Sequence, residues 1–170
     1  AYHEALEIYK GLNHQQGVAK VFQAIGWVYH NQGAYEEALE QFQHALKLNQ
    51  RLGNRVLQGA ILGNMGSVYK NQSKYDLCLS HYQQALEIAR EIGNKIGEGK
   101  TLGNMGNVYR VQGKYDLCLS HYEQSVEIAR EIGNKRSEGH ILGNMGIVYQ
   151  SQGKYDLCLS HYEQSVEIAR

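Results

Sequence analysis

The sequence repeats itself at a fixed interval, and this feature constrains the fold more than any other. Residues 62–66, Leu-Gly-Asn-Met-Gly, return as residues 102–106 and 142–146, so successive copies start 40 residues apart. The nonapeptide Lys-Tyr-Asp-Leu-Cys-Leu-Ser-His-Tyr, which begins at Lys74, returns twice at the same interval. Such a period is typical of arrays in which each unit stacks on the next, because one unit alone cannot bury its apolar face.

Each period predicts two helices. In the third period, Asn94 is placed to cap the first helix and Gly113 to end it. Between them, Leu102, Met105 and Tyr109 form an apolar stripe at helical spacing. The chain contains no proline, which permits helix almost throughout. We therefore predict an all-α chain without strands, with nine helices near residues 1–12, 16–31, 35–52, 55–71, 75–92, 95–111, 115–132, 135–151 and 155–170.

The chain contains 19 glycines, although each glycine in a helix interior costs about 1 kcal/mol relative to alanine. Gly106 lies within the apolar stripe, and we predict that it faces the small residues Cys118 and Ser125. Small residues at a crossing let two helices approach closely. A hairpin this rich in glycine needs neighbours on both sides.

These residues resemble the tetratricopeptide repeat. That family's signature is a bulky residue, Leu-Gly and Tyr on the first helix, then Ala, an aromatic residue and Ala on the second. The matching residues are Leu102, Met105-Gly106, Tyr109, Cys118, Tyr122 and Ser125 in the third period, and Phe22, Ile25-Gly26, Tyr29, Ala38, Phe42 and Ala45 in the first. The resemblance implies a right-handed α-solenoid of antiparallel helix hairpins.

The period departs from the family's usual 34 residues, and the usual proline after the second helix is absent. Both departures resemble a 40-residue subclass found in the Leu-Gly-Asn repeat adaptors, whose tripeptide stands at residues 62–64. Similar arrays also occur in bacterial signalling proteins, so the subclass leaves the biology open.

The period divides the chain into one array over residues 1–170. The repeats are a partial repeat at 1–18 (second helix only), full repeats at 19–58, 59–98 and 99–138, and a truncated repeat at 139–170. Because the copies are cut short at both ends, we expect the chain to come from a longer array and its terminal helices to allow end-to-end self-association.

The last two copies differ from each other only on the first helix. Residues 99–130 and 139–170 differ at five positions: Lys100/His140, Thr101/Ile141, Asn107/Ile147, Arg110/Gln150 and Val111/Ser151. At about 100° per residue, four of these positions share one arc, which lines the concave groove in the family's fold. Exposed positions drift in general, but the exposed positions on the second helix are identical here. We therefore predict that the groove has diversified to contact a partner.

The predicted groove is cationic in a chain whose 17 Lys and Arg balance 17 Asp and Glu. It carries no acidic residue, which favours an extended acidic peptide as ligand. Bare positions such as Gly103 would let a peptide lie close to the helix. The candidate peptide-binding residues are Lys20, Gln23, Trp27, His30, Asn64, Ser67, Lys70, Lys100, Asn104, Asn107, Arg110, His140, Asn144, Ile147 and Gln150.

Two features of this groove have alternative interpretations. Asn64, Asn104 and Asn144 form a ladder of amides able to grip a peptide backbone, or they cap and brace neighbouring helices. Trp27 is a candidate hot spot for binding, or it packs against the N-terminal partial repeat.

The function predicted from these patterns is a non-enzymatic interaction scaffold or adaptor that needs no cofactor and no metal. The alternatives are an RNA-binding helical-repeat module and a structural oligomerisation array. The zero net charge argues against nucleic acid and membrane surfaces, and no apolar run approaches the roughly 20 residues of a membrane span.

Two residue columns are predicted to be structural. Cys78, Cys118 and Cys158 should lie about 10 Å apart, beyond disulfide reach. They predict three reduced thiols and a cytoplasmic location. The column that begins at His81 is predicted to be exposed surface.

Overall fold

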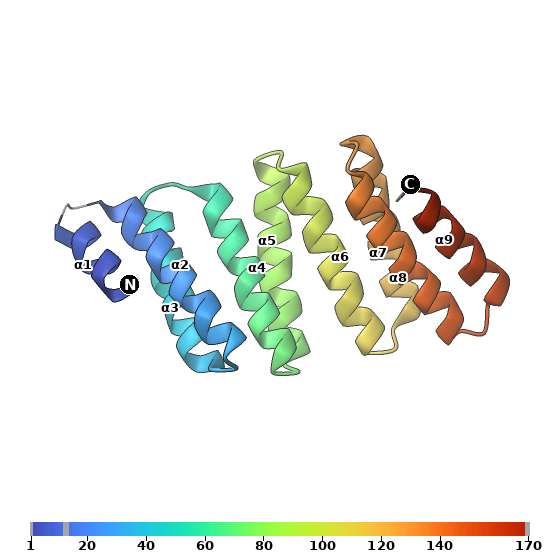
Figure 1. Cartoon of the computed structure of the whole chain (residues 1–170), viewed down its shortest axis with the longest axis horizontal. Coiled ribbons are helices and arrows are strands. Elements are labelled where there is room, and N and C mark those ends of the chain that lie inside the picture. Colours follow the sequence, from blue (N-terminus) through green and yellow to red (C-terminus); the bar gives the residue numbers. More distant parts are fainter. Residues whose placement is uncertain (1, 12–13, 169–170) are drawn as a thin grey trace. The chain divides into compact units, whose positions relative to one another are not determined.

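The computed structural model describes residues 2–11 and 14–168, which form nine helices and no strand (Figure 1). The predicted bounds are confirmed to within one residue wherever the described residues allow comparison; the predicted ends at residues 1, 12 and 170 lie outside them. The helices are α1 (Tyr2–Gly11), α2 (Gln15–Asn31), α3 (Tyr35–Arg51), α4 (Arg55–Asn71), α5 (Tyr75–Glu91), α6 (Lys95–Val111), α7 (Tyr115–Glu131), α8 (Lys135–Ser151) and α9 (Tyr155–Ile168).

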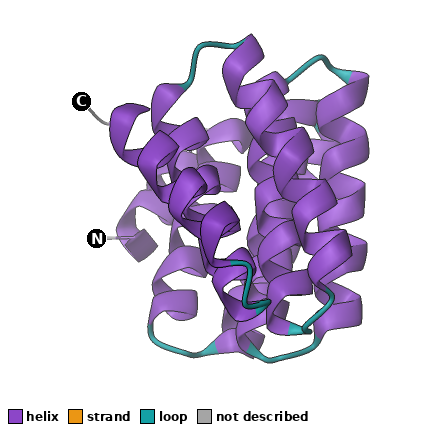
Figure 2. Cartoon of the chain, turned by 90° about the vertical axis from the view of Figure 1, so that its right-hand side faces the viewer, coloured by secondary structure: helices purple, strands orange, loops and turns teal. Residues whose placement is uncertain are grey.

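The chain forms two compact units, unit 1 over Ala1–Ile92 and unit 2 over Gly93–Arg170. Unit 1 contains α1 to α5, in which α2 pairs with α3 and α4 with α5. Unit 2 contains the pairs α6–α7 and α8–α9, and α7 also packs on α8. Short turns join the helices of each pair (Figure 2). Each unit is therefore built from antiparallel hairpins, as the family resemblance implies.

Asparagine and glycine set the ends of the helices. The side chains of Asn94 and Asn134 accept hydrogen bonds from the backbone N–H groups of Gly97 (3.0 Å) and Ser137 (3.1 Å), and the first of these bonds confirms the cap predicted at Asn94. Gly113 ends α6 with a φ of 70°, in the left-handed region where glycine carries no steric penalty.

The glycine inside each first helix makes room for an aromatic ring. A Cβ atom on Gly106 would lie 2.6 Å from ring atoms of Tyr122, and one on Gly66 would lie 2.7 Å from the ring of Tyr82. The prediction that Gly106 faces two small side chains was therefore wrong, although the backbone oxygen of Cys118 is near. The fully buried tyrosine fills the space that the bare helix leaves, which explains why glycine is needed there.

The hydrophobic cores follow the predicted stripes. In unit 1, Ala38, Phe42, Ala45, Ile61, Met65 and Val68 form one buried cluster. In unit 2 the buried cluster is Cys118, Tyr122, Val126, Ile141, Leu142, Met145 and Val148. All three cysteines are free and buried. No described helix combines the length and apolar content that crossing a bilayer requires.

The histidine column is half-buried, which corrects the prediction of exposed surface. The Nδ1–H of His121 donates to the carbonyl oxygen of Leu117 at 2.8 Å, and its ring centroid lies 5.0 Å from that of Tyr109. His81 and His161 repeat both contacts. Each histidine thus stays close to the surface of its own hairpin because one backbone bond and one tyrosine ring hold it.

Candidate peptide-binding groove

Unit 2 contains a hollow of about 350 Å³, formed by α6 from Lys95 to Asn107, the end of α7 with the turn after it, and the start of α8. Four of the predicted binding residues line it: Lys100, Asn104, Asn107 and His140. They come from two first helices and lie on the face predicted to form a groove. The structure therefore brings these four together within one unit.

The hollow has an apolar wall that sequence reasoning missed. Ile128 and Ile132 from the end of α7, Ile96 from the start of α6, and Ile141 from α8 contribute to it. The side chain of Ile96 is 67% exposed and that of Ile132 is 37% exposed. The sequence did carry a signal for this wall, which was an isoleucine close to the turn between two helices. The prediction took binding residues only from one arc of the first helices and therefore did not include these isoleucines.

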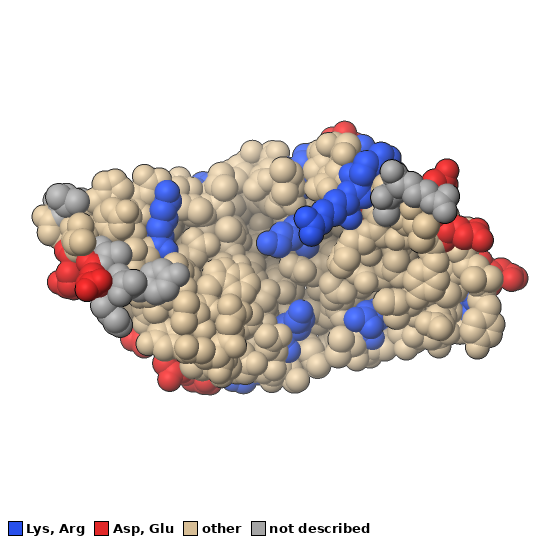
Figure 3. Space-filling view, in the orientation of Figure 1, with Lys and Arg blue, Asp and Glu red and all other residues tan. Residues whose placement is uncertain are grey.

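The rim of the hollow is positively charged. Lys95, Lys100 and Arg136 line it, and no Asp or Glu is among its lining residues. Lys95 contacts Glu131 (3.4 Å) and Glu98 (3.5 Å), and these carboxylates raise its pKa above the usual value. Figure 3 shows Lys and Arg side chains gathering over the starts of α6 and α8.

Two of these cations are available to a ligand. Within the described part of the chain, Lys100 and Arg136 form no ion pair, and both are exposed. Because their charges are not neutralised by a neighbouring carboxylate, they can attract the acidic groups of a partner.

The side chains of the asparagine ladder make no hydrogen bond to the described residues. Asn64, Asn104 and Asn144 are half-buried, and no described residue bonds their side-chain amides. Capping is performed instead by Asn54, Asn94 and Asn134. The ladder amides therefore keep both donor and acceptor capacity for another molecule.

Two predicted binding residues are occupied by tyrosine hydroxyls. The hydroxyl of Tyr122 donates to Oδ1 of Asn107 at 2.7 Å. Ser67 donates to the carbonyl oxygen of Gly63 and lies 3.0 Å from the hydroxyl of Tyr82, whose pKa burial raises to about 12. Asn107 keeps its amide donor for a ligand, whereas the hydroxyl of Ser67 is largely committed to packing.

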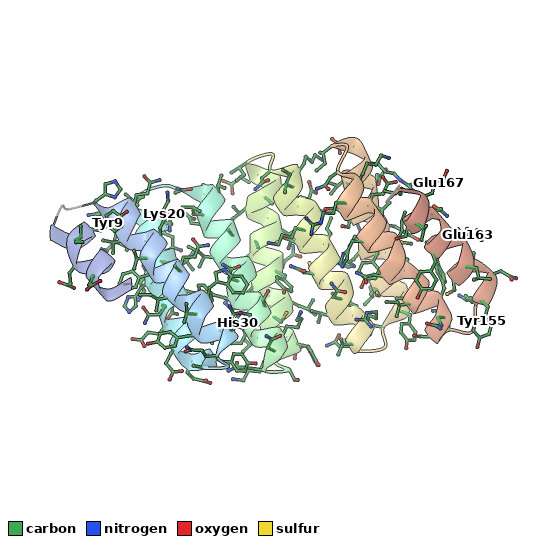
Figure 4. All side chains as sticks on the ribbon, in the orientation of Figure 1. Tyr9, Lys20, His30, Tyr155, Glu163 and Glu167 are labelled. Atoms are coloured by element: carbon green, nitrogen blue, oxygen red, sulfur yellow. The ribbon has the colours of Figure 1, made fainter. Side chains whose placement is uncertain are left out.

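Four of the predicted residues of unit 1 lie along α2, and the other three lie on α4. Lys20 lies near the start of α2 and His30 near its end (Figure 4). Nδ2 of Asn71 lies 2.9 Å from Nε2 of His30, and burial, with the nearby charge of Lys70, lowers the pKa of His30. His30 is therefore neutral near pH 7, and it accepts from the Asn71 amide.

Trp27 lies between these ends and is 39% exposed. Its ring meets that of Phe42 edge-on at 6.4 Å and lies 5.1 Å from that of His30. These ring contacts are with α3 and α2, and a substantial part of the indole stays accessible. Gln23 is half-buried beside it on the same helix.

Arg110 stands apart from the hollow. It lies ten residues beyond Lys100, which is about 15 Å along a helix. Its Nε atom is buried and has no hydrogen-bond partner in the described chain. On α8, Ile147 and Gln150 are likewise exposed beyond the hollow. Of the predicted groove residues of unit 2, four therefore line the hollow, whereas Arg110, Asn144, Ile147 and Gln150 do not.

Tetratricopeptide repeat profiles match residues 19–52, 57–110 and 97–170. The chain belongs to the tetratricopeptide repeat family. It is therefore a protein-interaction repeat scaffold, while the Leu-Gly-Asn subclass remains a prediction. No curated protein matches the chain.

Solved structures share this fold at low sequence identity. BtubC from P. vanneervenii is 18% identical with a TM-score of 0.86, over 99% of this chain and 70% of that one. Aspartyl phosphate phosphatase F from Bacillus subtilis is 18% identical with a TM-score of 0.80, over 96% of this chain and 43% of that one. RapI in its apo form is 18% identical with a TM-score of 0.87, over 99% of this chain and 47% of that one. The chain thus spans less than half of the last two proteins.

Proposed function

We propose that the chain is a non-enzymatic adaptor whose first helices hold an extended acidic segment of a partner protein. The observation that carries this proposal is the hollow of unit 2, in which unpaired Lys100 and Arg136 face a space that no carboxylate lines. Asn104 and Asn144 supply free amides on the two first helices of the same unit. The single array over residues 1–170 remains part of the proposal, because the 40-residue period continues unbroken through residue 92.

The two kinds of residue contribute different effects. A neutral hydrogen bond from an amide to the peptide backbone contributes roughly 0.5–1.5 kcal/mol net. The cations mainly speed association, an effect that salt weakens because the Debye length falls from about 10 Å at 0.1 M to 3 Å at 1 M. Asn104→Ala should therefore raise the dissociation rate at any ionic strength, whereas Lys100→Glu should slow association mainly at low salt.

A salt titration with three probes tests the proposal. The probes are a blocked peptide rich in Asp and Glu, its Asn and Gln counterpart, and single-stranded RNA. We expect the acidic peptide to bind most tightly at low salt and to lose affinity with Lys100→Glu, but not with Lys154→Glu, an exposed residue outside the hollow. Equal binding of the neutral peptide, or tighter binding of RNA, would contradict the proposal.

We also propose that α9 docks a second copy of the chain. Tyr155, Leu159 and Val166 are 66%, 60% and 56% exposed, and they form an apolar face on α9. Their counterparts on α7, which include the buried Val126, pack in the core with residues of α8. A first helix of the second copy, with apolar residues like those of α8, would cover this face.

Sedimentation velocity over a range of concentrations tests the docking of a second copy. Leu159→Glu should abolish association, and Leu117→Glu, at an exposed position on α7, serves as the control. A chain that stays monomeric at high concentration would overturn the idea.

An intracellular location is part of the same proposal. The three free, buried cysteines fit a reducing compartment. Burial raises the pKa of Cys78 and Cys118 to about 11, so both thiols stay protonated and unreactive near neutral pH.

A further inference from the structure

The hollow of unit 2 combines two kinds of surface in one place. Its wall is aliphatic, with Ile128 from α7, Ile132 directly after α7, and Ile141 from α8. Its rim carries Lys100, Arg136 and His140. A volume of about 350 Å³ lies within the roughly 300–1,000 Å³ range of small-ligand sites. A purely acidic segment would satisfy the rim and leave the wall uncovered.

We propose that this hollow is an anchor pocket, which takes one aliphatic side chain of a partner segment while acidic residues on either side meet Lys100 and Arg136. This inference rests on the proposed function and adds the ligand's chemistry to it: an acidic protein segment interrupted by leucine, isoleucine or methionine. Charge complementarity selects an acidic occupant, and the exposed isoleucines select the apolar anchor.

A missing side chain keeps the hollow open. A Cβ atom on Gly103 would lie 2.9 Å from Cδ1 of Ile141 and 3.4 Å from Oγ of Ser125. The hydroxyl of Ser125, which also lines the hollow, donates to the carbonyl oxygen of Gly99 at 2.8 Å. A longer side chain at position 103 would therefore displace Ile141 and change the lining of the hollow.

The exposed isoleucines at the edge of the hollow favour a ligand that would cover them. Ile96 remains 67% exposed in the described chain, on the edge of the same hollow as Lys100. Isolated exposed aliphatic residues are common, but here the exposed Ile96 and Ile132 adjoin a buried apolar wall. Contact with a ligand's side chain would remove both from water and strengthen binding.

The corresponding place in unit 1 has lost these properties. Eighty residues earlier, Gln23 stands where Gly103 leaves the helix bare, and Trp27 stands at the place of Asn107. Val56 stands at the place of the cationic Arg136, and Ala60 stands at the place of His140. The anchor pocket is therefore a property of unit 2, and unit 1 supplies the substitutions that should close it.

Selection from a random displayed-peptide library tests the proposal. The library is panned on the 170-residue chain, and the selected peptides are measured by fluorescence anisotropy against Gly103→Gln, Arg136→Val and Gly143→Gln. The first two variants copy unit 1. The third is the matched control, because a Cβ atom on Gly143 meets only Oγ of Ser165, at 3.6 Å, and Gly143 does not line the hollow.

We expect a consensus with one aliphatic position flanked by Asp or Glu. Gly103→Gln should weaken the selected peptide roughly tenfold or more, which is the scale expected for one excluded aliphatic side chain. Arg136→Val should weaken it several-fold at low salt, and Gly143→Gln should leave the affinity unchanged. Replacement of the peptide's aliphatic residue by Asn should reproduce the loss without altering the protein.

The outcomes separate this proposal from the function on which it rests. Acidic peptides without an aliphatic position, bound equally by Gly103→Gln, would overturn the anchor pocket and leave the acidic groove standing. A consensus without acidic residues, or no enrichment at all, would overturn both. If Gly103→Gln fails to fold, loss of affinity on replacing the peptide's aliphatic residue still supports the anchor, and an unchanged affinity overturns it.

Discussion

The packing of α7 on α8 in unit 2 uses charge at the place where the packing of α3 on α4 in unit 1 uses neutral amides. In unit 2, Nε of Arg130 donates to Glu138 at 2.7 Å and Nζ of Lys135 donates to its other oxygen at 3.1 Å. Glu138 is buried, and hydrogen bonds from Arg130 and Lys135 hold the pKa of its carboxyl below the usual value.

In unit 1, Gln58 occupies the place of Glu138. Its Nε2 donates to the backbone oxygen of Asn49 at 3.0 Å, and its Oε1 accepts from Arg55 at 3.0 Å. Asn49 is also buried, and its Nδ2 donates to the carbonyl oxygen of Ala45 at 2.9 Å. The same repeat frame therefore accepts an ionic or a neutral link between hairpins, and only the ionic link makes stability depend on pH.

The largest expected difference between the units is in the free energy of unfolding lost when the ionic link of unit 2 or the amide link of unit 1 is removed. Glu138→Ala deletes two charge-assisted hydrogen bonds at a buried site, and we expect a loss of about 1.5–3 kcal/mol in the free energy of unfolding. Gln58→Ala deletes neutral bonds and one bond from Arg55, and should cost about 1–1.5 kcal/mol. Urea unfolding followed by circular dichroism measures both. Equal losses would show that charge adds nothing to the link.

The pH dependence sharpens the same comparison. The pKa of Glu138 in the folded chain lies below its value of about 4.3 in the unfolded chain. The contribution of ionised Glu138 to the free energy of unfolding is therefore fully present above the unfolded pKa, and it is lost as the pH falls through the folded pKa. The urea midpoint of the wild type should therefore fall more steeply below about pH 4.5 than that of Glu138→Gln. Parallel pH profiles for the two proteins would contradict this assignment.

The turn after α4 in unit 1 and the turn after α6 in unit 2 differ at one position, and we expect this difference to change the free energy of unfolding by less than the links do. Ser73 has a φ of 58° after α4, whereas Gly113 has a φ of 70° at the corresponding place after α6. A non-glycine residue in this region costs roughly 1–2 kcal/mol, so Ser73→Gly should stabilise the chain by up to that amount. Gly113→Ser, the reciprocal change, should destabilise it similarly. Thermal unfolding of the two variants checks the sign of each effect.

The smallest expected effect is at Asn49. Its Oδ1 is buried without a hydrogen-bond partner in the described chain, and the corresponding residues in later repeats are Ala89 and Ala129. Asn49→Ala removes an unsatisfied acceptor and improves helix propensity, at the loss of one local bond. We expect a change of less than about 1 kcal/mol, in the stabilising direction. A large destabilisation in urea would mean that the Asn49 side chain positions the link to Gln58.

Helix positions were predictable because local signals mark them. Asn94 caps and Gly113 stops its helix through bonds and dihedral angles that depend on a few neighbouring residues. The apolar stripe of α6 likewise predicted the buried Leu102 and Met105, since a helix repeats every 3.6 residues. The family followed from the same residues, because the period carries its signature through the whole chain.

The candidate site was only partly predictable. Lys100, Asn104, Asn107 and His140 were found because they share one helical arc in two successive copies. Ile96 and Arg136 precede Lys100 and His140 by four residues on α6 and α8, and they were missed because the predicted arc began only at residues 100 and 140. Ile132 was missed because it reaches the hollow from the end of α7, and the pattern along a first helix carries no information on which part of a neighbouring helix packs beside it.

The sequence by itself determined that this chain is a helical tetratricopeptide repeat array, with helix bounds set by asparagine and glycine, because those properties depend on contacts within about one turn. Tertiary structure alone decided which side chains are free to bind. It placed the ring of Tyr122 over Gly106 and its hydroxyl on Asn107, left the amide of Asn104 unbonded, and brought Lys100 to Arg136 across a hollow. The physical reason is that free hydrogen-bonding capacity, unpaired charge and exposed apolar surface depend on which distant groups pack nearby.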